Sequence, residues 1–159
     1  MFKFILLLTL YLPCVSMADS ASPLFSLTLH DLNDKQVAMA KYKGKALIVN
    51  FWARWCAPCR EEIPEFIRLQ AVYRNKVDIL GIGLEDDAAA VQGFASQYKI
   101  NYPVLLAKNE GIPLMKALGN HRGGLPFTLA IDRHGKIVYS KLGLMRKADL
   151  EAAISLALQ

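Results

Sequence analysis

The sequence lacks the residues from which several kinds of site are built. It holds only three cysteines and three histidines among 159 residues. A closed zinc site usually needs four ligands, and His30, His121 and His134 form no pair at finger-like spacing beside a second cysteine pair. Internal repeats and low-complexity tracts are also absent. The chain is therefore expected to form one series of elements, with no metal and no other cofactor.

Excess charge of one sign is small as well. The formal net charge is +5 at pH 7, and it falls by one if Lys3 is removed with a leader. The lysines and arginines are scattered along the chain, whereas a nucleic-acid-binding surface usually gathers them in a cluster. We therefore expect a mildly basic surface and no nucleic-acid partner.

Long apolar runs are confined to the N-terminus. Residues Phe4 to about Leu12 are apolar, Lys3 precedes them, and Ser16-Met17-Ala18 follows. This layout is typical of a secretory signal peptide at residues 1–18 that is cleaved after Ala18. The run is shorter than the ~20 residues of a usual membrane span. A cleaved leader is thus the prediction, and a membrane-anchored form is the alternative.

Cleavage after Ala18 would leave one cysteine pair. Cys14 would leave with the signal peptide, and Pro13 before it disfavours a lipoprotein. The mature chain would then carry only Cys56 and Cys59. In a periplasmic or otherwise extracytoplasmic compartment, such a pair can form a disulfide.

The apolar pattern predicts one domain at residues 25–159 behind a short tether at 19–24. FSLTLHDL (25–32) alternates apolar and polar residues, which indicates an edge strand. Further strands are expected at 45–53, 77–85 and 102–107, helices at 58–75, 87–99, 111–119 and 145–159, and a hairpin at 127–132 and 136–142. This order predicts an α/β fold with a mixed central sheet and helices on both faces.

The stretch NFWARWCAPCREEIP (50–64) places the cysteine pair between a strand and a helix. A strand that ends near Ala53 and a helix that begins near Cys56 put this thiol at a helix N-terminus, where free N–H groups lower the pKa of a thiol toward neutrality. Cys59 lies one turn later on the same face, and Pro58 is tolerated in the first turn. The spacing predicts an attacking thiol, Cys56, and a more shielded resolving thiol, Cys59.

Two structural interpretations of the pair compete with redox chemistry. A static disulfide across two intervening residues would restrict the unfolded chain very little, so it would stabilise the fold weakly. A metal site would need further ligands, and the spacing of the histidines does not provide them. Both are weaker than the interpretation of the pair as a reaction centre.

The segment FWARWCAPCREEIPEF, with VNFWA at its start and GGLPFTLAIDRHGKIV farther along, resembles the exported thioredoxin-like thiol-disulfide oxidoreductases of the TlpA, ResA and CcmG type. The resemblance covers essentially the whole mature chain. It implies a thioredoxin fold with an N-terminal strand extension and an extracytoplasmic reductase that has a Cys-x-x-Cys centre. It does not identify the client protein.

The resemblance also assigns further site residues. Pro126 matches the cis-proline of the family, which leaves the backbone of Leu125 free to pair with a bound client. Glu62 matches an acidic residue that many members carry three positions after the second cysteine. Asn50 departs from ordinary thioredoxins, which hold a buried aspartate there, and an amide cannot accept a proton. Proton handling would therefore pass to Glu62, whose pKa partial burial would raise. Trp55 is expected beside the site.

Expectations also follow for four further residues. Trp52 is expected to pack beneath the site. Pro64, within the predicted helix, is expected to kink it and has no assigned chemistry. His121 and Arg122 lie in an exposed loop that precedes Pro126 and are candidates for client contact.

These residues predict a protein-disulfide reductase that acts on disulfide-containing exported proteins. Cys56 would attack the client, and Cys59 would resolve the mixed disulfide. A membrane thiol donor would restore the dithiol, and the family role in cytochrome c maturation makes apocytochrome c a candidate client. Two alternatives remain. A thiol peroxidase would need threonine at the position of Ala53, and a copper-binding chaperone would use both cysteines and a histidine such as His134.

Overall fold

The computed structural model describes residues 20–159. The expected signal peptide, its cleavage after Ala18 and the first tether residue lie outside the described residues. Within the described part, no helix combines the length and the apolar character that a membrane span needs.

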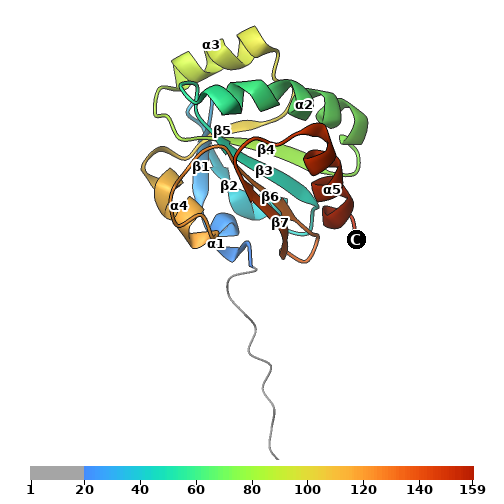
Figure 1. Ribbon diagram of the computed structural model, residues 1–159. Helices are drawn as coiled ribbons and strands as arrows, with labels where there is room; N and C mark the ends of the chain where they lie inside the picture. Colours follow the sequence, from blue (N-terminus) through green and yellow to red (C-terminus); the bar gives the residue numbers. More distant parts are fainter. Residues whose placement is uncertain (1–19) are drawn as a thin grey trace, which may run out of the picture.

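A seven-stranded mixed sheet forms the centre of the domain (Figure 1). Its strands, in spatial order, are β2 (Gln36–Ala38), β1 (Thr28–Asp31), β5 (Val104–Leu106), β4 (Asp78–Gly83), β3 (Leu47–Trp52), β6 (Phe127–Ile131) and β7 (Ile137–Leu142). Strand β3 runs parallel to β4 and antiparallel to β6, and β6 and β7 form the expected hairpin. The mixed sheet of the expected α/β architecture is confirmed.

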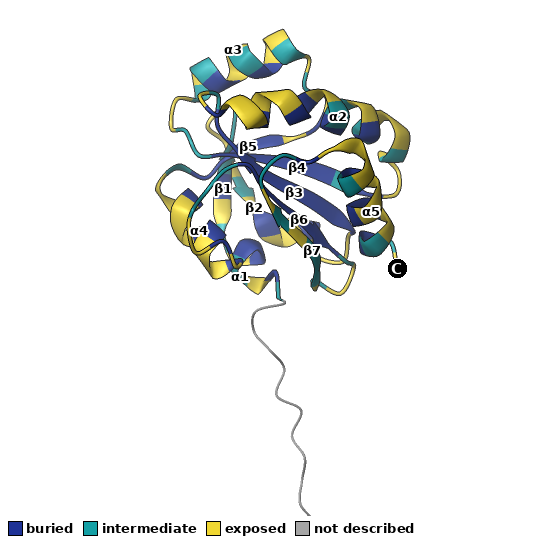
Figure 2. Ribbon diagram, in the orientation of Figure 1, coloured by how far each residue is buried: buried dark blue, intermediate teal, exposed yellow. Residues whose placement is uncertain are grey.

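Helices cover both faces of this sheet. Helices α2 (Ala57–Tyr73), α3 (Ala88–Tyr98) and α5 (Lys147–Ala157) lie on one face, and α1 (Ser22–Phe25) and α4 (Gly111–Ala117) lie on the other (Figure 1). The 3₁₀ helices η2 (Met39–Tyr42) and η3 (Lys108–Glu110) join neighbouring elements. Figure 2 shows the central strands buried between the two layers. Each face therefore has its own apolar core.

Two expectations for the N-terminal region are wrong. The strand at 25–32 is shorter and is not at the edge, because β1 pairs with both β2 and β5. Strand β2 was not expected, since three residues are too few to show a clear alternation. The tether expected at 19–24 is packed from Ser20 onward: Ala21 and Leu24 are fully buried, and Ser20 forms a bridge with Lys136.

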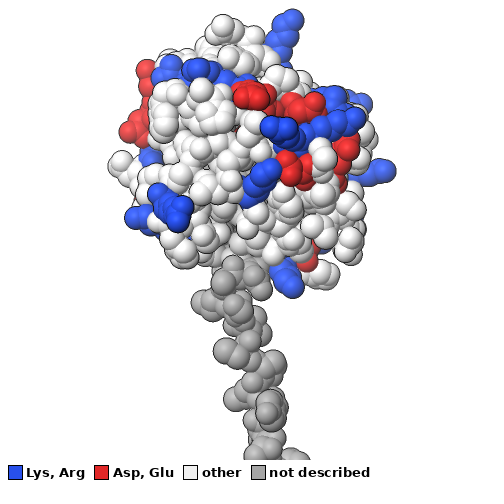
Figure 3. All heavy atoms as spheres, in the orientation of Figure 1, with Lys and Arg blue, Asp and Glu red and all other residues white. Residues whose placement is uncertain are grey.

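The face seen in Figure 3 carries basic and acidic side chains next to one another. Where α2 and α5 meet, for example, Arg68 pairs with Glu65 at 2.9 Å and with Glu151 at 3.5 Å. Charges of opposite sign are therefore interspersed over these helices.

Candidate active site

The two cysteines lie where β3 leads into α2. Cys56 is the N-cap residue of α2 and forms a disulfide with Cys59, with the two Cα atoms 5.3 Å apart. The backbone N–H of Cys59 donates to Sγ of Cys56 at 3.3 Å. After reduction, this N–H and the positive end of the helix would stabilise a thiolate at Cys56. Cys56 is 6% exposed and Cys59 is fully buried, so the expected difference in shielding is confirmed.

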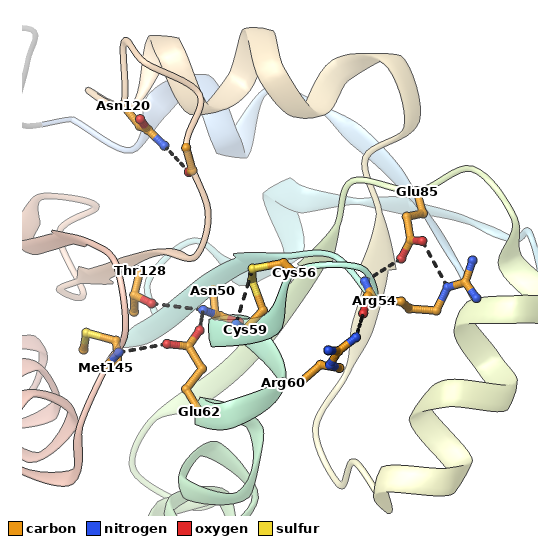
Figure 4. The surroundings of a disulfide bond; sticks show 11 residues. Asn50, Arg54, Cys56, Cys59, Arg60, Glu62, Glu85, Asn120, Thr128 and Met145 are labelled. Atoms are coloured by element: carbon orange, nitrogen blue, oxygen red, sulfur yellow. Dashed lines mark hydrogen bonds and ion pairs between the residues drawn. A yellow bond between two sulfur atoms is a disulfide. The ribbon is translucent and has the colours of Figure 1, made fainter.

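Glu62 lies one turn beyond Cys59 and is almost completely buried, with 1% of its surface exposed. The Nδ2 group of Asn50 donates to Oε1 of Glu62 at 2.7 Å, and the backbone N–H of Met145 donates to Oε2 at 2.9 Å (Figure 4). Burial raises the pKa of Glu62 to about 7, and the two hydrogen bonds, which favour the charged form, oppose this rise. The expected upward shift of the pKa is confirmed, with burial more complete than expected.

Asn50 connects this carboxyl to the central strands. It belongs to β3, where its register partners are Gly81 of β4 and Thr128 of β6. Its Nδ2 also donates to Oγ1 of Thr128 at 3.0 Å, whereas its buried Oδ1 finds no partner among the described residues. Asn50 thus orients and hydrogen-bonds Glu62 but cannot take its proton.

Sequence reasoning missed Thr128 and Met145. Thr128 could have been found, because it comes two residues after Pro126 in the strand expected beside β3. Met145 contributes through its backbone N–H, so no side-chain pattern could have indicated it.

The other predicted site residues differ in backbone geometry and in exposure. The Leu125-Pro126 bond is cis, as the resemblance implied, and Leu125 packs against the apolar core that contains both cysteines. Trp55 is 69% exposed, whereas Trp52 is 1% exposed and packs in the same core as Cys56. Trp52 stacks at a tilt on Phe94 of α3, with the ring centroids 5.3 Å apart, so its place beneath the site stays a prediction.

Pro64 lies inside α2, and the helix continues past it to Tyr73. The expectation that this proline kinks the helix stays a prediction.

The copper-binding alternative gains no support from the donor residues. In the described residues, no three His, Cys, Asp or Glu side chains form a group that could hold a metal ion. His134, its suggested third ligand, lines a hollow together with Ser20, Lys43 and Arg133. The site holds a cysteine pair, closed here as a disulfide, and the Glu62 carboxyl one helical turn from Cys59. A cysteine pair and a nearby proton acceptor suit thiol-disulfide exchange.

The buried carboxyl makes a prediction about stability. The folded oxidised protein retains the Glu62 proton up to about pH 7, whereas an unshifted glutamate releases it near 4.5. Because the folded state binds more protons in this interval, the free energy of unfolding should fall by roughly 3 kcal/mol as the pH rises from 4.5 to 7. Urea unfolding should show this fall for the wild type and not for Glu62→Gln. Parallel curves for the two proteins would contradict it.

Comparison with known proteins agrees with this geometry. Residues 17–154 match the Redoxin family. Thiol-disulfide oxidoreductase ResA of Bacillus thuringiensis is 34% identical over 123 residues, which cover 76% of this chain and 68% of that protein. ResA of Geobacillus kaustophilus is 31% identical over 133 residues, which cover 83% and 73% of the two chains.

Solved structures show the same fold. A thioredoxin-family thiol:disulfide interchange protein from Chlorobium tepidum superposes with a TM-score of 0.71 at 31% identity, over 84% of this chain and 93% of that one. The fold is therefore the thioredoxin fold, as the resemblance implied. With its cysteine pair at the N-terminus of α2, the chain belongs to the Redoxin family and is a thiol-disulfide oxidoreductase.

Proposed function

We propose that the chain reduces disulfides of exported proteins outside the cytoplasm. The observation that carries this proposal is the unequal exposure of the two cysteines: Cys56 retains 6% of its surface, whereas Cys59 is fully buried one helical turn from a carboxyl of raised pKa. Such a pair separates the attack on a client from the release of the client. The presence of a leader-like sequence before residue 20 supports an extracytoplasmic location.

The reaction takes two exchanges. The Cys56 thiolate attacks one sulfur of the client disulfide, which forms a Cys56–client bond, and the second client sulfur leaves and takes up a proton. Cys59 then transfers its proton to Glu62 and attacks Sγ of Cys56. This step forms the Cys56–Cys59 disulfide and releases the first client sulfur, which is protonated. The client has gained two electrons, and a membrane thiol donor must return two electrons to the cysteine pair.

The client would lie along the loop that precedes β6. Leu125 and Pro126 provide the backbone of this loop, and Trp55, next to Cys56 in the chain, offers an exposed ring. A hollow of about 320 Å³, lined by residues that include His121, Phe127 and Leu142, continues from this loop. These groups fit an extended peptide with one apolar side chain.

Apocytochrome c is the client class that we propose, because its haem-attachment motif, Cys-x-x-Cys-His, forms a disulfide that must be reduced before haem is attached. A peptide with this motif in its disulfide form should be reduced faster than a peptide of the same composition that presents the two cysteines in another order. Equal rates would leave the reductase activity standing and remove the client assignment.

Trapping tests the reductase assignment. Reduced Cys59→Ala protein should form a stable mixed disulfide through Cys56 with a disulfide-bonded model protein, visible on a non-reducing gel. The matched Cys56→Ala variant, whose remaining thiol is buried, should form almost none. Equal trapping by both variants would show that Cys56 is not the attacking residue.

Redox poise distinguishes a reductase from an oxidase. The Ala57-Pro58 dipeptide lacks the histidine that strongly oxidising relatives place between their cysteines. We therefore expect a potential nearer the about −270 mV of thioredoxin than the about −120 mV of a strong oxidant. Equilibration with glutathione buffers measures it, and a value above roughly −150 mV would contradict the reductase assignment.

Export makes a separate prediction. The mature protein should begin at Asp19 and be recovered outside the cytoplasm, because the apolar leader ends in the small-residue pattern Ser16-Met17-Ala18. Mass spectrometry of the intact protein checks this. Recovery of the Met1 form from the membrane fraction would instead establish an anchor.

A further inference from the structure

The turn that carries the cysteine pair is held at one residue, Arg54. The backbone N–H of Arg54 donates to Oε2 of Glu85 at 2.8 Å, and its Nε donates to Oε1 of the same carboxylate at 3.1 Å. The Nη1 group of Arg60 donates to the carbonyl oxygen of Arg54 at 2.9 Å (Figure 4). Both backbone polar groups of Arg54 and its side chain are thus bound. We call Arg54, Arg60 and Glu85 the Arg54 cluster.

This cluster connects three elements at the edge of the sheet where Cys56 lies. Glu85 follows the end of β4, Arg54 follows the end of β3, and Arg60 is in the first turn of α2. The N–H of Cys56 donates to the carbonyl of Ala53 at 3.1 Å, so Arg54 and Trp55 are the central residues of a β-turn. The Arg54 cluster therefore fixes the turn immediately before the attacking sulfur.

The cluster also balances a charge two residues before Cys56 in the chain. The side chain of Glu85 is 13% exposed and that of Arg54 is 35% exposed, so water screens this pair less than a fully exposed one. An unpaired cation near a thiol favours its thiolate, and an unpaired anion disfavours it. The Glu85 carboxylate therefore offsets a cation that lies two residues before Cys56.

We propose that Glu85 is a positioning residue that holds the turn before Cys56 and, by neutralising Arg54, limits the fraction of Cys56 present as thiolate. The proposal concerns the oxidoreductase centre itself and holds for any client. It assigns no contact with the client to Glu85.

The other charged groups around the cysteine pair are the same in every variant of the test. Arg60 and Glu61 lie on α2, and Glu62 is buried beside Asn50, with Lys141 of β7 acting on its charge. These groups are unchanged in each variant, so differences in the pH profile report the Arg54–Glu85 pair. Glu62→Gln variants of the same proteins would show whether titration of Glu62 contributes.

A charge cycle tests the proposal on the reduced full-length chain. Glu85→Gln keeps an oxygen that can accept from the N–H of Arg54 but removes the negative charge. At pH 6, iodoacetamide should then alkylate Cys56 about three to ten times faster than in the wild type, because one pKa unit changes the thiolate fraction tenfold below the pKa. Arg54→Gln should slow alkylation by a similar factor. The double variant should return close to the wild-type rate.

The signs of these effects separate charge balance from simple support of the fold. A merely structural role would shift both single variants in the same direction and would not be repaired in the double variant. Asp86→Asn, which removes an exposed carboxylate from the adjacent position, should leave the profile unchanged. If Glu85→Gln had the wild-type alkylation profile from pH 5 to 9, the proposal would be overturned, whatever the outcome of the trapping experiment.

Discussion

Asn50→Asp should destabilise the oxidised protein by about 3 to 5 kcal/mol at pH 8, the usual effect of a buried charge without a partner. The Nδ2 of Asn50 lies 2.7 Å from Oε1 of Glu62, so a carboxylate at position 50 would replace a hydrogen-bond donor with a second anion. Two carboxyls this close share a proton. The folded protein would keep this proton at a pH far above the one at which the unfolded chain releases it. The loss should be much smaller at pH 5. Urea unfolding at both pH values measures it.

A swapped pair is the control for this result. Asn50→Asp combined with Glu62→Gln again places one carboxyl and one amide in contact, so most of the lost stability should return. A single Asn50→Asp protein as stable as the wild type at pH 8 would show that water reaches this carboxyl pair. That outcome would also remove the basis for the raised pKa of Glu62.

Glu62→Gln should slow resolution of the mixed disulfide by roughly 10- to 100-fold at neutral pH, at or below the usual range for general acid–base catalysis. Cys59 is fully buried and must lose a proton before it can attack Cys56. A carboxyl with a pKa of about 7 is suited to accept that proton. Glutamine keeps the shape and can still accept a hydrogen bond from Asn50, but it does not titrate. The pH dependence of the step should therefore flatten.

Stopped-flow reduction of a model disulfide can follow this step separately from the first attack. Glu61→Gln is the matched control, because Glu61 is the exposed neighbour on the same helix and should change neither the rate nor the pH profile. Identical profiles for Glu62→Gln and the wild type would return Glu62 to a purely structural role. Activation of Cys59 would then rest with water and the helix N-terminus.

The sequence predicts those parts of the fold that have strong local patterns. The strand expected at 45–53 is β3 (Leu47–Trp52), all six residues of which are buried. Asp87 caps α3 by accepting from the N–H of Ala90. Strand β2 has only three residues with mixed exposure, so its pairing with β1 decides its structure. The tether was wrong for a similar reason, since Ala21 and Leu24 become buried only through contacts with distant residues.

The candidate site divides in the same way. Cys56, Cys59 and Pro126 stand in recognisable local motifs, and the spacing from Cys59 indicates Glu62. The contact between Glu62 and Met145 joins positions 83 residues apart, and the contact between Arg54 and Glu85 joins positions 31 apart. Such contacts depend on how β4, α2 and α5 come together, and a single sequence does not encode them as a local pattern.

The burial of Cys59 limits the order in which partners can react. Because Cys56 is the only residue of the pair with any exposed surface, a client and an electron donor would both have to react at Cys56. They cannot occupy the enzyme together, so turnover should follow ping-pong kinetics, with parallel lines in double-reciprocal plots. Each substrate at high concentration should also inhibit competitively against the other. The client and the electron donor therefore compete for one sulfur, although turnover requires both.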